Sequence, residues 1–208
     1  LGDQDLATLL LSNRDITDID DFLNPQYESL HDPNLMHGMT EAVDRVTKAI
    51  GKKEKILIFS DFDADGVPGA VILSDFFKKI GYEHYEVYIP NRNIEGFGLN
   101  TSACQQFIDN GTQLVVTIDC GISNINEVAM LRKADVDVIV TDHHLPSTEG
   151  LPDAIVVDPK QPDCTYPFKD LCGSGVVFRL VQALLVRLRE TQDSHVADVP
   201  EGWEKWLL

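Results

Sequence analysis

Three aspartates at alternate positions, Asp61, Asp63 and Asp65, come directly after an apolar run of strand length in the stretch KILIFSDFDADG at 55–66. Three like charges within five residues repel one another, so the cluster is unfavourable unless a cation or a set of hydrogen-bond donors holds it. The pattern therefore predicts a metal site at the end of a buried strand.

The same arrangement, an aliphatic run that ends in an acid, recurs three times downstream. LVVTID ends in Asp119, VDVIVTDHH ends in Asp142, His143 and His144, and AIVVDP carries Asp158. Continuous apolar runs are typical of strands that are buried on both faces, which indicates a mainly parallel sheet with helices on either side. Ligands of such sheets bind beyond the carboxyl ends of the strands. We therefore expect the acidic strand ends to meet in one crevice.

Strand and helix patterns alternate after residue 51, as in a doubly wound sheet. The expected strands are 55–60, 85–89, 114–118, 136–141 and 154–157. The expected helices between and after them are 67–80, 102–109, 124–133 and 176–189. The predicted fold class is thus α/β, a doubly wound, mainly parallel five-stranded sheet with helices on both faces. Residues 1–51 are expected to form an N-terminal helical segment that packs on the core, and residues 52–208 the main domain.

Composition narrows the classes of function. The net charge of −17 argues against a stand-alone nucleic-acid binder, which normally carries a surplus of Lys and Arg. Bound divalent cations would offset part of that charge locally. The four cysteines lack CxxC spacing, which favours reduced thiols in a cytosolic protein. No apolar run approaches twenty residues and no basic-then-apolar leader is present, so neither a membrane span nor a signal peptide is predicted.

The acids and histidines together make a ligand set for hard divalent cations. Asp63, Asp65, Asp119 and His143 supply oxygens and an imidazole, which suit Mn²⁺ or Mg²⁺. So many carboxylates exceed the needs of one ion, and two ions about 3.5–4 Å apart are usual in phosphate-ester hydrolysis. Asp119, on the central strand, is the candidate that bridges both ions. His143 and His144 cannot point the same way from an extended backbone, so one would bind metal and the other would meet the phosphate or donate a proton.

Two further segments are candidate phosphate contacts. Arg92 lies in a glycine-bearing loop after a predicted strand, where it is either a phosphate ligand or an ordinary solvated charge. The GSG stretch at 173–175 opens a predicted helix, and anions are favoured at helix N-termini.

Plainer interpretations of the DFDADG stretch are less consistent with the rest of the chain. The pattern also begins an EF-hand calcium loop, but Ile72 stands at the twelfth position, where that loop needs a bidentate Glu. A turn whose acids are satisfied by backbone amides without a metal is a second alternative. The other acid-ended strands and the double histidine favour the metal site over both.

Four motifs, in the order DFDADG, VVTIDCGIS, VTDHH and LCGSGVVFRL, resemble those of the DHH phosphoesterase superfamily. The flanking segments FLNPQYESLHDP, IPNRNIEGFGLN and VVDPKQPDCTYPFKDL are similar to those of its single-strand-specific DNA exonucleases. The resemblance covers essentially the whole chain. It implies a DHH domain and a nuclease that uses two Mn²⁺ or Mg²⁺ ions to degrade single-stranded DNA from the 5′ end in recombination and repair. It also implies a cytoplasmic location, no membrane, and a single-strand-binding protein or a helicase as candidate partners.

The resemblance assigns a role to each matching residue. The implied metal ligands are Asp61, Asp63, Asp65, Asp119 and His143. The implied catalytic residues are Asp119, which contacts both metals, Asp142, which orients the histidines, and His143 and His144. The expected contacts to the substrate phosphate are His144, Arg92, Gly173, Ser174 and Gly175. Asp158 stands where the family often has Asn, and we expect a supporting role for it.

Two departures from the family pattern affect the expected activity. Pro68 stands where the family usually has a small hydroxyl residue, which leaves the ligands intact. The family's fourth motif, a further metal-binding aspartate, should follow the terminal WEKWLL but is not in the sequence. We therefore expect an N-terminal fragment of a longer enzyme, with an incomplete metal site and little activity of its own.

Three other functions fit parts of the sequence. A haloacid-dehalogenase-like phosphatase would use Asp63 as its nucleophile, but it needs a downstream Lys and a late acidic pair in place of VTDHH. A DHH-family phosphodiesterase or pyrophosphatase that acts on small substrates shares all the motifs. A non-catalytic DHH scaffold should have lost ligands, whereas the residues of the first three motifs are present here.

Overall fold

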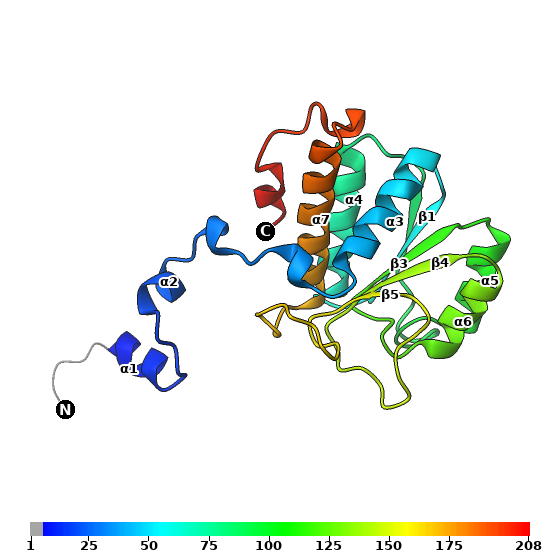
Figure 1. Cartoon of the computed structure of the whole chain (residues 1–208). Helices are drawn as coiled ribbons and strands as arrows, with labels where there is room; N and C mark the ends of the chain where they lie inside the picture. The colour runs from blue at the N-terminus through cyan, green and yellow to red at the C-terminus, as the bar shows by residue number, and fades with distance from the viewer. Residues whose placement is uncertain (1–5) are drawn as a thin grey trace. The chain divides into compact units, whose positions relative to one another are not determined.

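The computed structural model describes residues 6–208, which form two compact units divided between Asp32 and Pro33 (Figure 1). The first unit contains the helices α1 (Leu6–Ser12) and α2 (Ile19–Leu23) and the 3₁₀ helix η1 (Tyr27–Ser29). Helix α3 (Met39–Lys52) belongs to the second unit. The division therefore lies upstream of the boundary expected at residues 51 and 52.

The second unit is built on a five-stranded sheet with the order β2-β1-β3-β4-β5. Its strands are β1 (Ile56–Ser60), β2 (Tyr85–Tyr88), β3 (Leu114–Ile118), β4 (Asp137–Thr141) and β5 (Ile155–Val157). Every pairing is parallel, which confirms the predicted fold class. The chain leaves β1 toward β2 on one side and then returns to add β3 on the other. The carboxyl ends of β1 and β3 thus form the switch point at which such sheets bind ligands.

Helices cover both faces of the sheet, as the apolar strands require. One face carries α3, α4 (Gly66–Lys79) and α7 (Gly173–Glu190), and the other carries α5 (Thr101–Asp109) and α6 (Ile125–Lys133) (Figure 1). Leu57 and Phe59 of β1 pack in one buried cluster with Phe107 of α5 and Leu131 of α6. Because alternate residues of a strand face opposite sides, the buried Ile58 faces the other layer of helices.

The remaining described elements are short. They are the 3₁₀ helices η2 (Pro33–Leu35), η3 (Ser194–Val196) and η4 (Trp203–Leu207). Across residues 6–208, no helix combines the length and the apolar character that crossing a membrane requires.

Candidate metal centre

Three acidic residues leave the sheet side by side because the strand register places them there. Ser60, Ile118 and Thr141 are partners in neighbouring strands, and Asp61, Asp119 and Asp142 are the next residues along the chain. The backbone ladder continues through them: Asp61 N–H donates to Ile118 O at 3.1 Å, and Asp119 N–H donates to Thr141 O at 2.9 Å. Backbone hydrogen bonds of the sheet thus hold the three acids next to one another. The sequence pattern predicted that these strand ends would meet.

Asp119 has an unusual backbone conformation, with a φ of 60°. Few residues other than glycine adopt a positive φ, and those that do are often found at functional sites. The residue is 2% exposed and directly follows the central strand β3. The fold therefore holds a buried carboxylate in a conformation that local preferences alone would not favour.

A first group of possible ligands consists of Asp61, Asp63 and Asp119. One carboxylate oxygen from each lies within 4.8 Å of those of the other two. Asp61 is 3% exposed, and no hydrogen-bond donor within residues 6–208 reaches its buried Oδ1 atom. A buried carboxylate oxygen without a donor, beside two other acids, is a favourable position for a cation.

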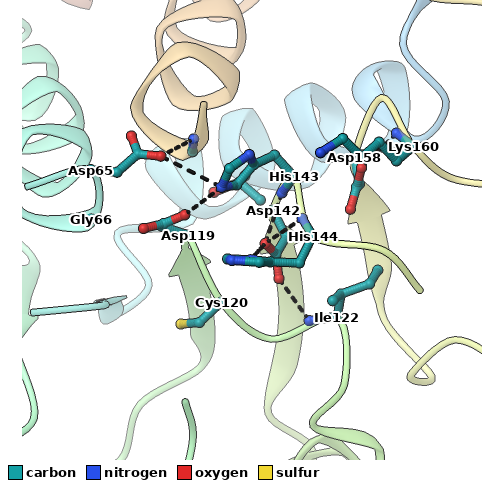
Figure 2. Close-up of polar contacts among 12 residues, drawn as sticks. Asp65, Gly66, Asp119, Cys120, Ile122, Asp142, His143, His144, Asp158 and Lys160 are labelled. Atoms are coloured by element: carbon teal, nitrogen blue, oxygen red, sulfur yellow. Dashed lines mark hydrogen bonds and ion pairs between the residues drawn. The ribbon is translucent and has the colours of Figure 1, made fainter. Parts of the chain in front are cut away.

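A second group of possible ligands also includes Asp119. The Nε2 atom of His143 lies 3.1 Å from Asp119 Oδ1 and 3.6 Å from Asp65 Oδ2 (Figure 2). Ligand atoms of Asp119, His143 and His144 also lie within 4.8 Å of one another. Asp119 belongs to both groups, which is the position that one carboxylate needs in order to contact two ions.

The pKa values of these carboxylates are shifted in different directions. Burial raises the pKa of Asp119 to about 8, and the nearby Asp65 and Asp63 add repulsion. Burial also raises the pKa of Asp61. The pKa of Asp63 is lowered, because the N–H groups of Gly66 and Asp65 donate to its Oδ1 at 3.0 and 2.8 Å. A divalent cation would stabilise the ionised forms of Asp61 and Asp119 that the protein alone disfavours.

Asp65 is partly buried, and its two carboxylate oxygens contact the first turn of α7. Burial raises its pKa, but hydrogen bonds, chiefly from Ser174 and Gly173, outweigh that effect, and the pKa is lowered. Gly173 N–H donates to Oδ2 at 2.6 Å and Ser174 N–H donates to Oδ1 at 2.7 Å. These contacts join residues more than a hundred positions apart, and no motif in the sequence signals them.

Asp142 makes a different set of contacts. It is fully buried, and its Oδ1 accepts the N–H groups of His143 at 2.7 Å and His144 at 3.1 Å. The Nδ1 atom of His144 lies 2.7 Å from the same oxygen, and Ile122 N–H donates to Oδ2 at 3.0 Å (Figure 2). Asp142 thus contacts the His144 ring and the backbone of both histidines, and these donors leave it little capacity for a metal.

The residues expected to contact phosphate lie in two different settings. The side chain of His144 is 48% exposed, and exposed Arg92 places its guanidinium carbon 5.3 Å from the ring centroid of Phe62, next to Asp61. Both side chains therefore lie at the rim of the acidic group. The N–H groups of Gly173 and Ser174, by contrast, donate to Asp65 in this structure. A phosphate would have to displace that carboxylate to reach them, so contacts from the 173–175 turn stay a prediction.

Asp158 directly follows β5 (Figure 2). It is fully buried, and its Oδ1 accepts the N–H of Lys160 at 2.6 Å. Within the described part of the chain, its Oδ2 atom has no hydrogen-bond partner. Burial raises the pKa of Asp158 to about 7. The supporting role expected for this residue stays a prediction.

Comparisons with known proteins show the family and the fold of the chain. Residues 55–200 match the DHH family, N-terminal domain. The chain is 44% identical over 168 residues to the single-stranded-DNA-specific exonuclease RecJ of Bacillus subtilis, covering 80% of this chain and 21% of that protein. The structure of RecJ in complex with Mn²⁺ from Thermus thermophilus superposes with a TM-score of 0.72 at 30% identity, covering 97% of this chain and 30% of that one. The Mg²⁺ complex of RecJ from the same organism gives a TM-score of 0.55 at 27% identity. This match covers 97% of this chain and 26% of that one.

Proposed function

This chain belongs to the DHH family, and from that premise we propose that it forms the metal-binding domain of a metal-dependent exonuclease that acts on single-stranded DNA. The observation that carries the proposal is the position of Asp119, whose carboxylate is shared by two groups of possible ligands. The chain spans only 21% of the length of the Bacillus subtilis relative, so the activity is proposed for the whole protein that contains it.

The proposed cofactor is Mn²⁺ or Mg²⁺. Asp61, Asp63 and Asp119 would hold one ion, and Asp65, Asp119 and His143 would contribute to a second. Oxygen ligands with one imidazole suit these two metals, and the unpartnered Oδ1 of Asp61 supports the fit. When bound, such ions lower the pKa of a coordinated water and polarise phosphoryl oxygens.

The protein's own residues would orient the substrate. Asp142 holds the His144 ring through Nδ1, so the rest of that half-exposed ring faces outward and is available to the phosphate or the leaving group. Arg92, at the rim beside Phe62, would contact a neighbouring phosphate. The fully occupied carboxylate of Asp142 would keep both histidines in place while DNA moves through the site.

The substrate and the cellular setting follow from the family resemblance. We propose digestion from the 5′ end in recombination and repair, in the cytoplasm, with a single-strand-binding protein or a helicase as partner. Cys104, Cys120, Cys164 and Cys172 are all free, which supports a reducing compartment. The net charge of −17 implies that basic surfaces elsewhere in the whole protein would hold the DNA backbone.

The test combines metal binding with a choice of substrates. Calorimetric titration of this chain with Mn²⁺ should show binding that Asp119→Ala abolishes, and this binding should be weaker than that of the whole protein, in which the family's fourth motif would complete the site. The whole protein should digest a labelled single strand in preference to a dinucleotide or pyrophosphate. A preference for the dinucleotide would replace the exonuclease with a phosphodiesterase of small substrates, and the absence of metal binding would refute the metal centre.

A further inference from the structure

The first turn of α7 contacts the metal centre through its backbone. The N–H groups of Gly173 and Ser174 each donate to a different oxygen of Asp65, at 2.6 and 2.7 Å. N–H groups in the first turn of a helix have no partner inside that helix, so a carboxylate is a favourable acceptor for them. Charge-assisted bonds of this kind are short and directional. Both oxygens of Asp65 are therefore fixed by the same helix.

Gly173 also allows the helix to approach Asp119. A Cβ atom built at position 173 would lie 2.5 Å from Asp119 Oδ1 and 2.6 Å from Asp119 Cβ, which is closer than real Cβ atoms come. The turn therefore lies against Asp119 only because residue 173 has no side chain.

The helix that carries this turn is firmly packed. Val176 and Val177, in the first turns of α7, are completely buried, and α7 packs against α3, α4 and the sheet. The N–H groups that hold Asp65 therefore cannot shift without disturbing the core.

We propose that the first turn of α7 is a positioning element of the metal centre, which holds Asp65 in place beside Asp119 and His143. The inference deepens the proposed function and rests on it for the identity of the ion. It assigns the backbone of 173 and 174 to a metal ligand instead of the substrate phosphate. The turn holds Asp65 so that its Oδ2 lies 3.6 Å from His143 Nε2. The same nitrogen lies 3.1 Å from Asp119 Oδ1.

The first test compares two amide variants in metal-free protein. Asp63 accepts both of its backbone bonds, from Asp65 and Gly66, on Oδ1 alone, so the amide oxygen in Asp63→Asn can keep both. Asp65 uses both oxygens, so Asp65→Asn must direct its NH₂ group at one N–H of α7. Each variant removes one negative charge from the acidic group, so the change in charge is the same in both.

The expected result is a difference in size. Asp65→Asn should lower the melting temperature by about 4 °C or more, whereas Asp63→Asn should lower it less, because its amide oxygen keeps both backbone bonds. If Asp65→Asn melts at or above the temperature of Asp63→Asn, the proposal is overturned. Because the measurement uses chelator-treated protein, it decides the anchoring of Asp65 even if the proposed nuclease function fails.

The second test adds the missing side chain. Gly173→Ala should weaken Mn²⁺ binding at least tenfold in a calorimetric titration, because the new Cβ meets Asp119. Gly51→Ala is the matched control: it lies in α3, a Cβ there would meet no atom within 4 Å, and its Mn²⁺ affinity should stay within twofold of wild type. Wild-type affinity in Gly173→Ala would refute the proposal. If that variant does not fold, the Asp65→Asn comparison decides.

Discussion

Asp119 and Asp142 follow neighbouring strands at the same register, and they are almost equally buried, at 2% and 0% exposed. Hydrogen-bond donors surround Asp142, whereas other carboxylates lie near Asp119. Asp142 has donors around both of its oxygens: three backbone N–H groups and the Nδ1 atom of His144. Asp119 faces the carboxylates of Asp65 and Asp63, and burial together with their charge raises its pKa to about 8.

Burial alone therefore does not distinguish the proposed metal ligand, Asp119, from the proposed orienting residue, Asp142. Hydrogen-bond donors surround the carboxylate of Asp142, whereas the ionised form of Asp119 would need a cation to stabilise it. The two positions should therefore respond in opposite ways to the same Asp→Asn substitution. The variants below test that contrast, beginning with the largest expected effect.

Asp119→Asn should weaken Mn²⁺ binding at least a hundredfold, which corresponds to about 3 kcal/mol or more. The metal-free protein should become no less stable, because the amide removes a charge that its neighbours repel. Calorimetric titration and urea unfolding in chelator measure the two effects. An affinity within tenfold of wild type would mean that Asp119 is not the shared ligand.

Asp142→Asn should destabilise the metal-free protein by about 2 kcal/mol. An amide has one acceptor oxygen, so either the histidine side or Ile122 N–H loses its bond. Mn²⁺ affinity should fall about tenfold, because His143 is no longer held in position. Urea unfolding beside Asp119→Asn checks the contrast, which would be lost if both variants were equally stable.

Asp158 extends the comparison to a buried acid that lacks a full set of donors. Its folded pKa of about 7 lies above the unfolded value of about 3.9, so the native state retains a proton that the unfolded chain releases. The unfolding free energy should therefore fall as pH rises from about 4 to 7, and we expect this residue to account for about 4 kcal/mol over that range.

Urea unfolding of metal-free protein at pH 5 and pH 8 measures that dependence. Between these two pH values the unfolding free energy of Asp158→Asn should fall by about 3 kcal/mol less than that of wild type, whereas the exposed Asp153→Asn should keep the full wild-type dependence. Equal pH dependence in Asp158→Asn and wild type would mean that Asp158 is ionised in the native protein.

The sequence predicted the sheet and the meeting of its acidic ends, because both follow from short-range pattern. Apolar runs that end in acids mark parallel strands, and parallel strands deliver their ends to one edge. All five strands were predicted, each within two residues of its observed bounds.

Spacing alone could not predict which acids accept hydrogen bonds and which are left without donors, because the donors are distant in sequence. Asp65 takes its two N–H groups from α7, and Asp142 takes one from Ile122. For the same reason the turn at 173–175 suggested a phosphate site, although the structure shows its first two N–H groups donating to Asp65. A motif identifies acids that converge, and only the hydrogen bonds show which of them remain free.

The smallest expected effect separates the two adjacent histidines. His143→Gln should weaken Mn²⁺ binding about tenfold, because its Nε2 lies 3.1 Å from the shared Asp119. His144→Gln should change the affinity less than threefold, because Nδ1 of His144 contacts Asp142 and the ring is half exposed. Parallel Mn²⁺ titrations of the two variants make the comparison. Equal losses would make His144 a ligand as well, since its ring also lies within 4.8 Å of Asp119 and His143, and the contact to the phosphate would then fall to Arg92 alone.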